Sequence, residues 1–184
     1  RLERMQRRPL LLFSSSRQAV LDNPYGRSKR AAEEAVLAWV RRSGASAVLF
    51  RFHGIFGKWC RPNYNSVTAT FCHNAVHDLP LAISDPAREL DLIYIDDVTA
   101  ALLGAVDGPP APAESEFREV QPVFRVTLGE LAETIRSFRD SRRSLVLPSF
   151  ASEFVRKLYA TYLSHLEGPE FSYALTQRRS EEHT

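Results

Sequence analysis

Two short runs of consecutive apolar residues limit what this 184-residue chain can fold into. Leu10 to Phe13 and Ala47 to Phe50 are apolar at every position, which is typical of parallel strands buried between helices. Between them, apolar residues recur at helical spacing and Gly44 follows as a stop signal. The residues of this segment are the apolar Ala32, Ala35, Val36, Trp39 and Val40, the acidic Glu33 and Glu34 expected in the first turns, and the basic Arg41 and Arg42 expected in the last. The pattern predicts a strand, crossover helix, strand unit and hence an α/β fold.

A further strand and helix are expected downstream. Leu92 to Ile95 predicts another strand, and Asp96 and Asp97 are expected to supply the cap and the dipole partners of a short apolar helix from Val98 to Val106. The segment Gly108 to Glu119 is rich in proline, alanine and glutamate, so we expect a surface loop there.

The last third of the chain reads as helical. Thr127 and Glu130 have the spacing of a capping box, which predicts a helix from Thr127 through Phe138. Past Pro148 the chain is expected to be helical and aromatic, as in a lid or interdomain segment.

Composition excludes several classes of protein. The net charge of +2 is spread along the chain, so we expect no nucleic-acid partner, and the four arginines of Arg1 to Arg8 are interpreted as a solvated helix end. No apolar run approaches the roughly 18 residues of a membrane span, and no signal-peptide pattern opens the chain, so we expect no membrane partner and a cytoplasmic setting. Cys60 and Cys72 form no zinc-ligand pair, and Cys72 with His73 and His77 lacks a fourth ligand, so we expect no metal.

Candidate chemistry lies just after the first buried strand. Ligands bind off the carboxyl ends of strands in open parallel sheets, and Ser16 lies at such a position. Tyr25 and Lys29 follow, four residues apart at a helix start, so they project from one face of that helix. An ammonium group beside a phenol favours the phenolate, which makes Tyr25 suited to proton transfer near neutral pH. Ser16 can hydrogen-bond the same substrate oxygen.

Ser16 with Tyr25-x-x-x-Lys29 resembles the catalytic set of the short-chain dehydrogenases, and Asn23 to Lys29 resembles their extended branch, the NAD-dependent epimerase/dehydratase family. The resemblance implies the C-terminal part of a Rossmann-like, doubly wound parallel sheet with a small, mostly helical substrate-binding subdomain. It also implies NAD(H) or NADP(H) as cofactor. The implied catalytic residues are Ser16, Tyr25 and Lys29, and the implied cofactor-binding residues are Tyr25, Lys29, Phe52 and His53.

The resemblance narrows downstream, at Phe56 to Ser66 and Ala69 to Cys72. These strings are similar to bacterial capsule and O-antigen enzymes that reduce the 4-keto group of a UDP-linked 2-acetamido-2,6-dideoxy-hexulose, on the route to UDP-N-acetyl-L-fucosamine. A UDP-sugar substrate and, for the full-length parent, a homodimer are implied. The implied substrate-binding residues are Gly54, Arg61, Asn63 and Asn65. At Gly54 the family usually has asparagine, and simple drift at a turn is the alternative interpretation.

The resemblance also implies a division of the chain. Residues 1–107 would form a partial NAD(P)-binding domain with the catalytic residues, and residues 108–174 its substrate-side helical part. The eight glycines form no GxxGxxG, so we expect the N-terminal Rossmann half to lie outside this chain, as well as the family's C-terminal cupin domain, and the chain alone to be inactive. Residues 175–184 are expected to be a non-native tail, because Arg179 to Thr184 reads like a translated sequencing adaptor.

Two alternatives to simple reduction stay open. The same fold supports sugar-nucleotide 4-epimerases and 4,6-dehydratases, and the dehydratases resemble one another in carrying Thr-Asp-Glu where this chain has Ser16-Arg17-Gln18. The absence of an acidic residue directly after Ser16 favours reduction. The second alternative is a non-enzymatic scaffold without a working cofactor site.

Overall fold

A computed structural model describes residues 9–111 and 113–172. The chain divides into two compact units, the first combining the chain up to Phe56 with Glu89–Val126, and the second combining Gly57–Arg88 with the chain from Thr127 onward. The functional boundary expected after residue 107 stays a prediction. The charged segment Arg1 to Arg8 and the tail at residues 175–184 lie outside the described residues.

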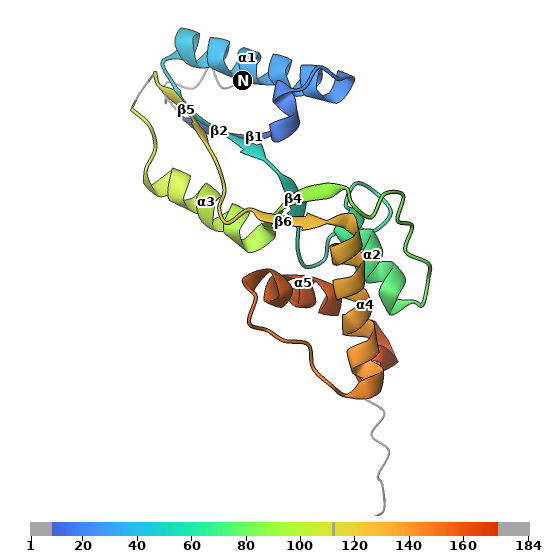
Figure 1. Cartoon of the computed structure of the whole chain (residues 1–184). Helices are drawn as coiled ribbons and strands as arrows, with labels where there is room; N and C mark the ends of the chain where they lie inside the picture. Colours follow the sequence, from blue (N-terminus) through green and yellow to red (C-terminus); the bar gives the residue numbers. More distant parts are fainter. Residues whose placement is uncertain (1–8, 112, 173–184) are drawn as a thin grey trace, which may run out of the picture. The chain divides into compact units, whose positions relative to one another are not determined.

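The first unit contains a three-stranded parallel sheet (Figure 1). Its strands are β1 (Leu10–Ser16), β2 (Ser46–Phe52) and β5 (Ser115–Arg118), in the order β1-β2-β5. The register runs to the ends of the first two strands, where Ser16 pairs with Phe52. The parallel pairing expected from the two apolar runs is confirmed, and both strands extend past those runs into polar residues.

Helices cover both faces of this sheet. The α1 helix (Pro24–Ser43) and the α3 helix (Ile95–Asp107) lie on opposite sides of it in Figure 1. Alternate β2 residues supply the two cores, because successive side chains of a strand point to opposite faces. Ala47 and Leu49 pack with Val40 of α1, whereas the other face is formed by Val48, Phe50, Phe52, Ile93, Val98 and Ala105. The α/β fold class is confirmed.

Local signals at the two ends of α1 explain its length. The Asn23 side chain accepts a hydrogen bond from the Gly26 N–H at 2.7 Å, and proline occupies the first helical position. Gly44 ends the helix in the left-handed conformation, with φ of 65°. The expectation that Glu33 lies in the first turns is wrong, because the helix begins at Pro24 and Glu33 is buried at its middle.

A four-residue strand was missed by the sequence interpretation. The segment Gly108 to Glu119 was expected to be a loop throughout, but β5 lies within it and pairs with β2. The strand is short and polar, and Phe117 is exposed, so no apolar run marks it. Its backbone pairs with β2, which is distant in sequence, so a local sequence pattern does not reveal the strand.

A second sheet has the order β3-β4-β6. Its strands are β3 (Gly54–Phe56), β4 (Glu89–Tyr94) and β6 (Phe124–Thr127), and β3 pairs with β4 in parallel. The strand expected at Leu92 to Ile95 is confirmed in part, since Ile95 already begins α3. Tyr94 is the N-cap of α3 and makes no side-chain capping bond, so the expected cap at Asp96 is wrong. Asp96 and Asp97 lie in the first turn, where their charges favour the helix dipole.

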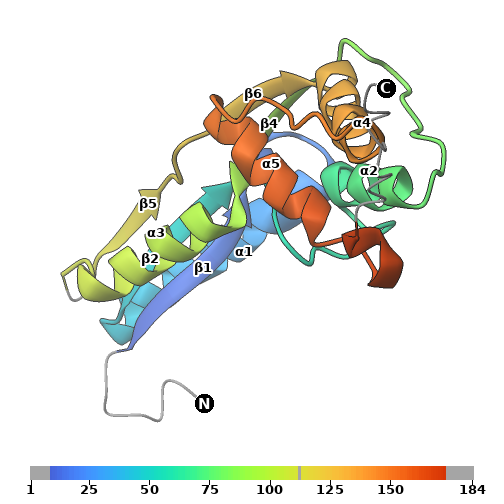
Figure 2. The same cartoon turned by 90° about the horizontal axis from the view of Figure 1, so that it is seen from below.

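The second unit is built from helices (Figure 2). They are α2 (Val67–Val76), α4 (Leu128–Ser144), α5 (Glu153–Leu163) and the short 3-10 helix η3 (Gly168–Phe171). The first three pack against one another around a core that includes Phe71, Leu131, Ile135, Phe138, Leu158 and Tyr162. The helical character expected past Pro148 and the capping box at the start of α4 are both confirmed, and α4 continues six residues beyond Phe138.

Candidate active site

The carboxyl end of β1 supplies the first candidate group. Ser16 is the last residue of the strand and leads into a 3-10 helix, η2 (Arg17–Val20). The Ser16 hydroxyl accepts a hydrogen bond from the Gln18 N–H at 3.1 Å, and so caps η2. Because the oxygen accepts this bond, the hydroxyl proton can still be donated to a substrate.

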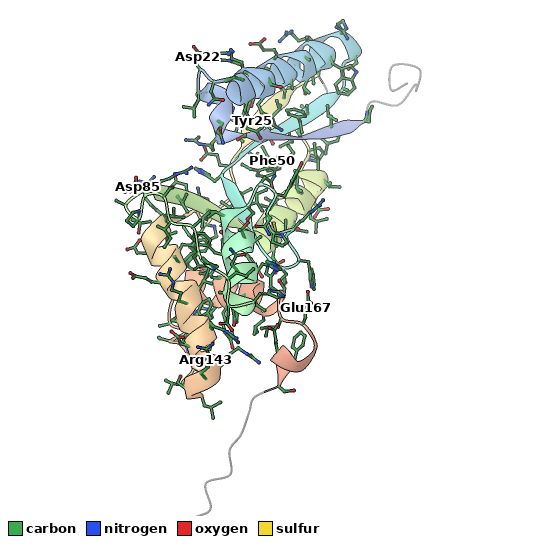
Figure 3. The ribbon with its side chains drawn as sticks, turned by 90° about the vertical axis from the view of Figure 1, so that its right-hand side faces the viewer. Asp22, Tyr25, Phe50, Asp85, Arg143 and Glu167 are labelled. Carbon is green, nitrogen blue, oxygen red and sulfur yellow. The ribbon has the colours of Figure 1, made fainter. Side chains whose placement is uncertain are left out.

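The start of α1 supplies the acid and its charged neighbour. Tyr25 is 50% exposed, and Figure 3 shows it at the end of α1 that lies next to β1. The Lys29 Nζ lies 5.7 Å from the centre of the Tyr25 ring and donates a hydrogen bond to the Ser14 carbonyl oxygen at 3.3 Å. The structure thus brings Tyr25 and Lys29 together beside the end of β1, where Lys29 contacts Ser14, two residues before Ser16.

A close backbone approach holds these two segments together. A Cβ atom added to Gly26 would lie 2.3 Å from the Gln18 carbonyl oxygen and 2.5 Å from that of Leu21. Both are backbone atoms, so they cannot move aside as a flexible side chain could. Glycine at this position therefore lets the segment around η2 pack directly on the first turn of α1.

A buried carboxylate lies one helical turn beyond Lys29. The Glu33 side chain is 3% exposed, accepts a hydrogen bond from the Ser15 hydroxyl at 2.5 Å, and pairs with the guanidinium of Arg51 at 2.6 and 2.9 Å. The hydrogen bonds from Arg51 lower the pKa of Glu33 below its usual range. The sequence interpretation missed this group. One signal was present, because Gly26, Glu33 and Val40 are spaced by seven residues and share one buried stripe of α1.

The end of β2 holds the predicted cofactor residues. Phe52 is 8% exposed and stacks on Phe50 with ring centres 5.5 Å apart, so its ring belongs to the sheet core. His53 follows, with Nδ1 3.7 Å from an Asp91 carboxylate oxygen. The hydrogen bond from Arg125 lowers the pKa of Asp91. The cofactor contacts of Phe52 and His53 stay predictions.

Gly54 is not at a turn. It begins β3 and pairs with Leu92 of β4, so the interpretation of a turn glycine is wrong. A Cβ atom at this position would lie 3.1 Å from the Leu92 Cδ2 and 3.3 Å from the Asp91 carbonyl oxygen. The position is therefore tight on the side facing β4, and its predicted contact with substrate stays a prediction.

The remaining predicted substrate residues belong to the second unit, in the exposed loop before α2. The Arg61 guanidinium lies 5.9 Å from the centre of the Tyr64 ring. Asn63 has a left-handed backbone, with φ of 55°, and its N–H donates to the Thr70 hydroxyl at 2.9 Å. Asn65 is exposed. Their predicted roles toward substrate stay predictions.

In residues 9–111 and 113–172, no three histidine, cysteine or acidic side chains are grouped so that they could hold a metal ion. Cys72 is buried, and burial raises the pKa of its thiol. Over the same ranges, every helix is too short or too polar to cross a membrane.

Comparison with known proteins identifies the family. A model of the NAD dependent epimerase/dehydratase family matches residues 13–116, which include the end of β1 and the whole of α1 and β2. The chain belongs to this family. The match covers Ser16, Tyr25 and Lys29 and therefore agrees with the resemblance seen in the sequence.

Two relatives match most of this chain. The chain is 46% identical over 163 residues to the UDP-2-acetamido-2,6-beta-L-arabino-hexul-4-ose reductase of Pseudomonas aeruginosa, across 89% of this chain and 43% of that protein. The crystal structure of the capsular polysaccharide assembling protein CapF from Staphylococcus aureus superposes with a TM-score of 0.89 at 38% identity, across 98% of this chain and 50% of that chain. The chain spans about half the length of these relatives.

More distant solved structures share the fold alone. The Bordetella bronchiseptica enzyme WbmF, solved in complex with NAD+, superposes with a TM-score of 0.71 at 17% identity, across 89% of this chain and 60% of that chain. This enzyme therefore has the same α/β fold as the chain.

Proposed function

We propose that this chain carries the acid, the charge partner and the carbonyl-binding hydroxyl of a nicotinamide-dependent reductase. Its substrate would be the 4-keto group of a UDP-linked 2-acetamido-2,6-dideoxy-hexulose, in the synthesis of a capsule or O-antigen precursor such as UDP-N-acetyl-L-fucosamine. One observation carries the proposal: Tyr25 and Lys29 lie together beside the carboxyl end of a parallel strand, in a chain 46% identical to a UDP-hexulose reductase.

Each candidate group has a defined task in this reaction. When bound, the nicotinamide cofactor supplies a hydride to the carbonyl carbon C4. The Ser16 hydroxyl donates a hydrogen bond to the carbonyl oxygen, and the Tyr25 phenol protonates the alkoxide as charge develops on it. The Lys29 ammonium stabilises the phenolate that is left. Tyr25 is half exposed, so water can return its proton.

The donor set at the start of α1 fits the ribose of a nicotinamide cofactor. A lysine ammonium has three N–H donors, and the Ser14 carbonyl oxygen takes one of those of Lys29. Two donors remain for the two ribose hydroxyls. His53, at the end of β2, is the second candidate for contact with the cofactor, which would be NADH or NADPH. Phe52 would support this edge from the core below it.

The exposed loop before α2 is the candidate for the nucleotide part of the substrate. Arg61 matches a diphosphate in charge and in the geometry of its donors. Asn63 and Asn65 add amide groups that can both donate and accept hydrogen bonds. Gly54 stands where the family usually has asparagine, and it would contact the sugar through its backbone.

The residues after Ser16 favour reduction over dehydration. Arg17 and Gln18 follow Ser16, and the Arg17 guanidinium pairs with the Glu119 carboxylate at 2.8 Å. A 4,6-dehydratase needs an acid and a base beside the catalytic hydroxyl, and neither Arg17 nor Gln18 can serve as that acid.

A cofactor-consumption assay tests the proposal and separates it from its alternatives. The protein encoded by the complete reading frame that contains this chain is incubated with NADPH or NADH and a UDP-4-keto-2-acetamido-2,6-dideoxyhexose. A reductase oxidises one cofactor for each hydroxyl formed, whereas an epimerase or dehydratase converts a UDP-hexose with no net oxidation. Conversion without cofactor consumption would overturn the proposal. A protein that neither turns over nor changes NADPH fluorescence would be the non-enzymatic scaffold.

A further inference from the structure

We propose that Glu33 is a positioning residue for the reduction, and that its buried carboxylate sets the places of Ser16 and Lys29 by holding the end of β1 against α1. This inference rests on the proposed function. Glu33 acts through two neighbours, Ser15 and Arg51, rather than through contact with substrate.

The Glu33 carboxylate accepts hydrogen bonds from two strands of the sheet. Ser15 and Arg51 are register partners on the adjacent strands β1 and β2. Both donate to the same carboxylate, Ser15 at 2.5 Å and Arg51 at 2.6 and 2.9 Å in a two-pronged pair. A planar guanidinium bound at both carboxylate oxygens has little freedom to rotate. One side chain of α1 is thus fixed to two strands at their carboxyl ends.

Ser15 lies between two groups of the proposed site, the Ser14 carbonyl oxygen and the Ser16 hydroxyl. The carbonyl oxygen of Ser14 accepts the hydrogen bond from Lys29, and the next residue along the strand is Ser16. A shift of Ser15 therefore moves the support of the ammonium and the carbonyl-binding hydroxyl together. Glu33 lies one helical turn after Lys29, so the same contact also fixes the axial position of Lys29 along α1.

Arg51 also links Glu33 to β5, the remaining strand of the sheet. The Arg51 guanidinium lies 4.5 Å from the centre of the Phe117 ring of β5, so the network reaches all three strands β1, β2 and β5. The charged groups that act on Glu33 are Arg51 of β2 and Arg30 of its own helix, and Ser15 of β1 adds a hydrogen bond. Together they keep the pKa of Glu33 low, so the carboxylate is charged at neutral pH.

Glu33 is a charged residue at a buried position. Burying a carboxylate is costly even when it is paired, and well-packed apolar residues in place of a buried ion pair often give equal or greater stability. The ion pair adds hydrogen bonds of fixed direction between Arg51 and Glu33. Such hydrogen bonds beside candidate catalytic groups are expected of a positioning residue.

Steady-state kinetics on the complete reading frame tests this inference. Glu33→Gln keeps the shape of the side chain and removes its charge. We expect kcat to fall by up to about 10²-fold, the scale of a displacement of about 1 Å, with a smaller rise in the KM for NADPH, because Lys29 would also hold the ribose. Glu34→Gln changes the neighbouring exposed carboxylate and should leave both quantities unchanged.

A double variant separates positioning from stability. Glu33→Met combined with Arg51→Met removes both buried charges, and we expect it to recover the thermal midpoint of the wild type but not its kcat. If the double variant recovers kcat, or if Glu33→Gln keeps the kcat of an active wild type, this inference is overturned while the proposed function stands. An inactive wild type would overturn the proposed function and this inference with it.

Discussion

At the scale of single residues, the Tyr25 phenol tests the proposed chemistry most directly. Tyr25→Phe in the complete reading frame should lower kcat by about 10²- to 10⁴-fold, because a positioned acid is lost. NADPH binding, measured from the change in NADPH fluorescence, should survive because the phenol acts on the substrate oxygen. Tyr162→Phe is the matched control, since this hydroxyl is buried and finds no hydrogen-bond partner within the described residues. Unchanged turnover in Tyr25→Phe would assign the proton to another group.

The neighbouring Gly26 tests the packing that brings the site together. Gly26→Ala places a methyl group against two backbone carbonyls, so η2 and α1 must separate. We expect a loss of about 1–3 kcal/mol in the free energy of unfolding, measured with urea, and a lower kcat. Gly104→Ala in α3 is the control, because a Cβ there meets nothing within 4 Å, and it should gain about 0.5–1 kcal/mol. Equal stability of the two variants would contradict the close approach at Gly26.

At the scale of elements, the start of α4 is held by local hydrogen bonds. The Thr127 hydroxyl accepts from the Glu130 N–H at 3.1 Å, and the Glu130 carboxylate accepts from the Thr127 N–H at 2.7 Å. Thr127→Ala should lower the free energy of unfolding by about 0.5–2 kcal/mol, measured by urea denaturation. Thr127→Ser keeps the hydroxyl and should lose far less. A serine variant as unstable as the alanine variant would mean that the methyl group, rather than the cap, stabilises this end.

At the scale of the whole molecule, carboxylates in both units should make stability depend on acid pH. Among the described residues, five carboxylates have a lowered pKa because each accepts hydrogen bonds, and they are Glu33, Asp78, Asp91, Glu130 and Glu153. A group with a lowered pKa stabilises the folded state above its unfolded pKa, near 4 for Asp and Glu, and this contribution is lost as pH falls through the folded value.

The urea midpoint should therefore be nearly constant above about pH 5 and fall steeply below about pH 4. Glu33→Gln should show a shallower fall than the wild type, because the titrating carboxylate is gone, and Glu34→Gln should follow the wild type. The same slope in Glu33→Gln and the wild type would show that Glu33 does not contribute to the acid response.

The sequence by itself determined features that depend on neighbours along the chain. The apolar runs before Ser14 and Arg51 predicted buried parallel strands, because a strand covered on both faces has no polar side. The capping box at Thr127 and the stop at Gly44 were readable because capping bonds span only a few residues. The spacing of Tyr25 and Lys29 fixed one helix face for both groups, and the structure brings them to the end of β1.

Tertiary structure alone decided the features whose partners are distant in sequence. The short strands β3, β5 and β6 form by pairing with other strands, and their few residues carry too little pattern to reveal it. Glu33 was expected only in the first turns of the helix, and an acidic side chain is rarely buried unless it is paired. Its partners, Ser15 and Arg51, each lie 18 residues away along the chain. Only the parallel pairing of β1 with β2 under α1 brings them to one carboxylate, so the burial of this charge was decided by the fold.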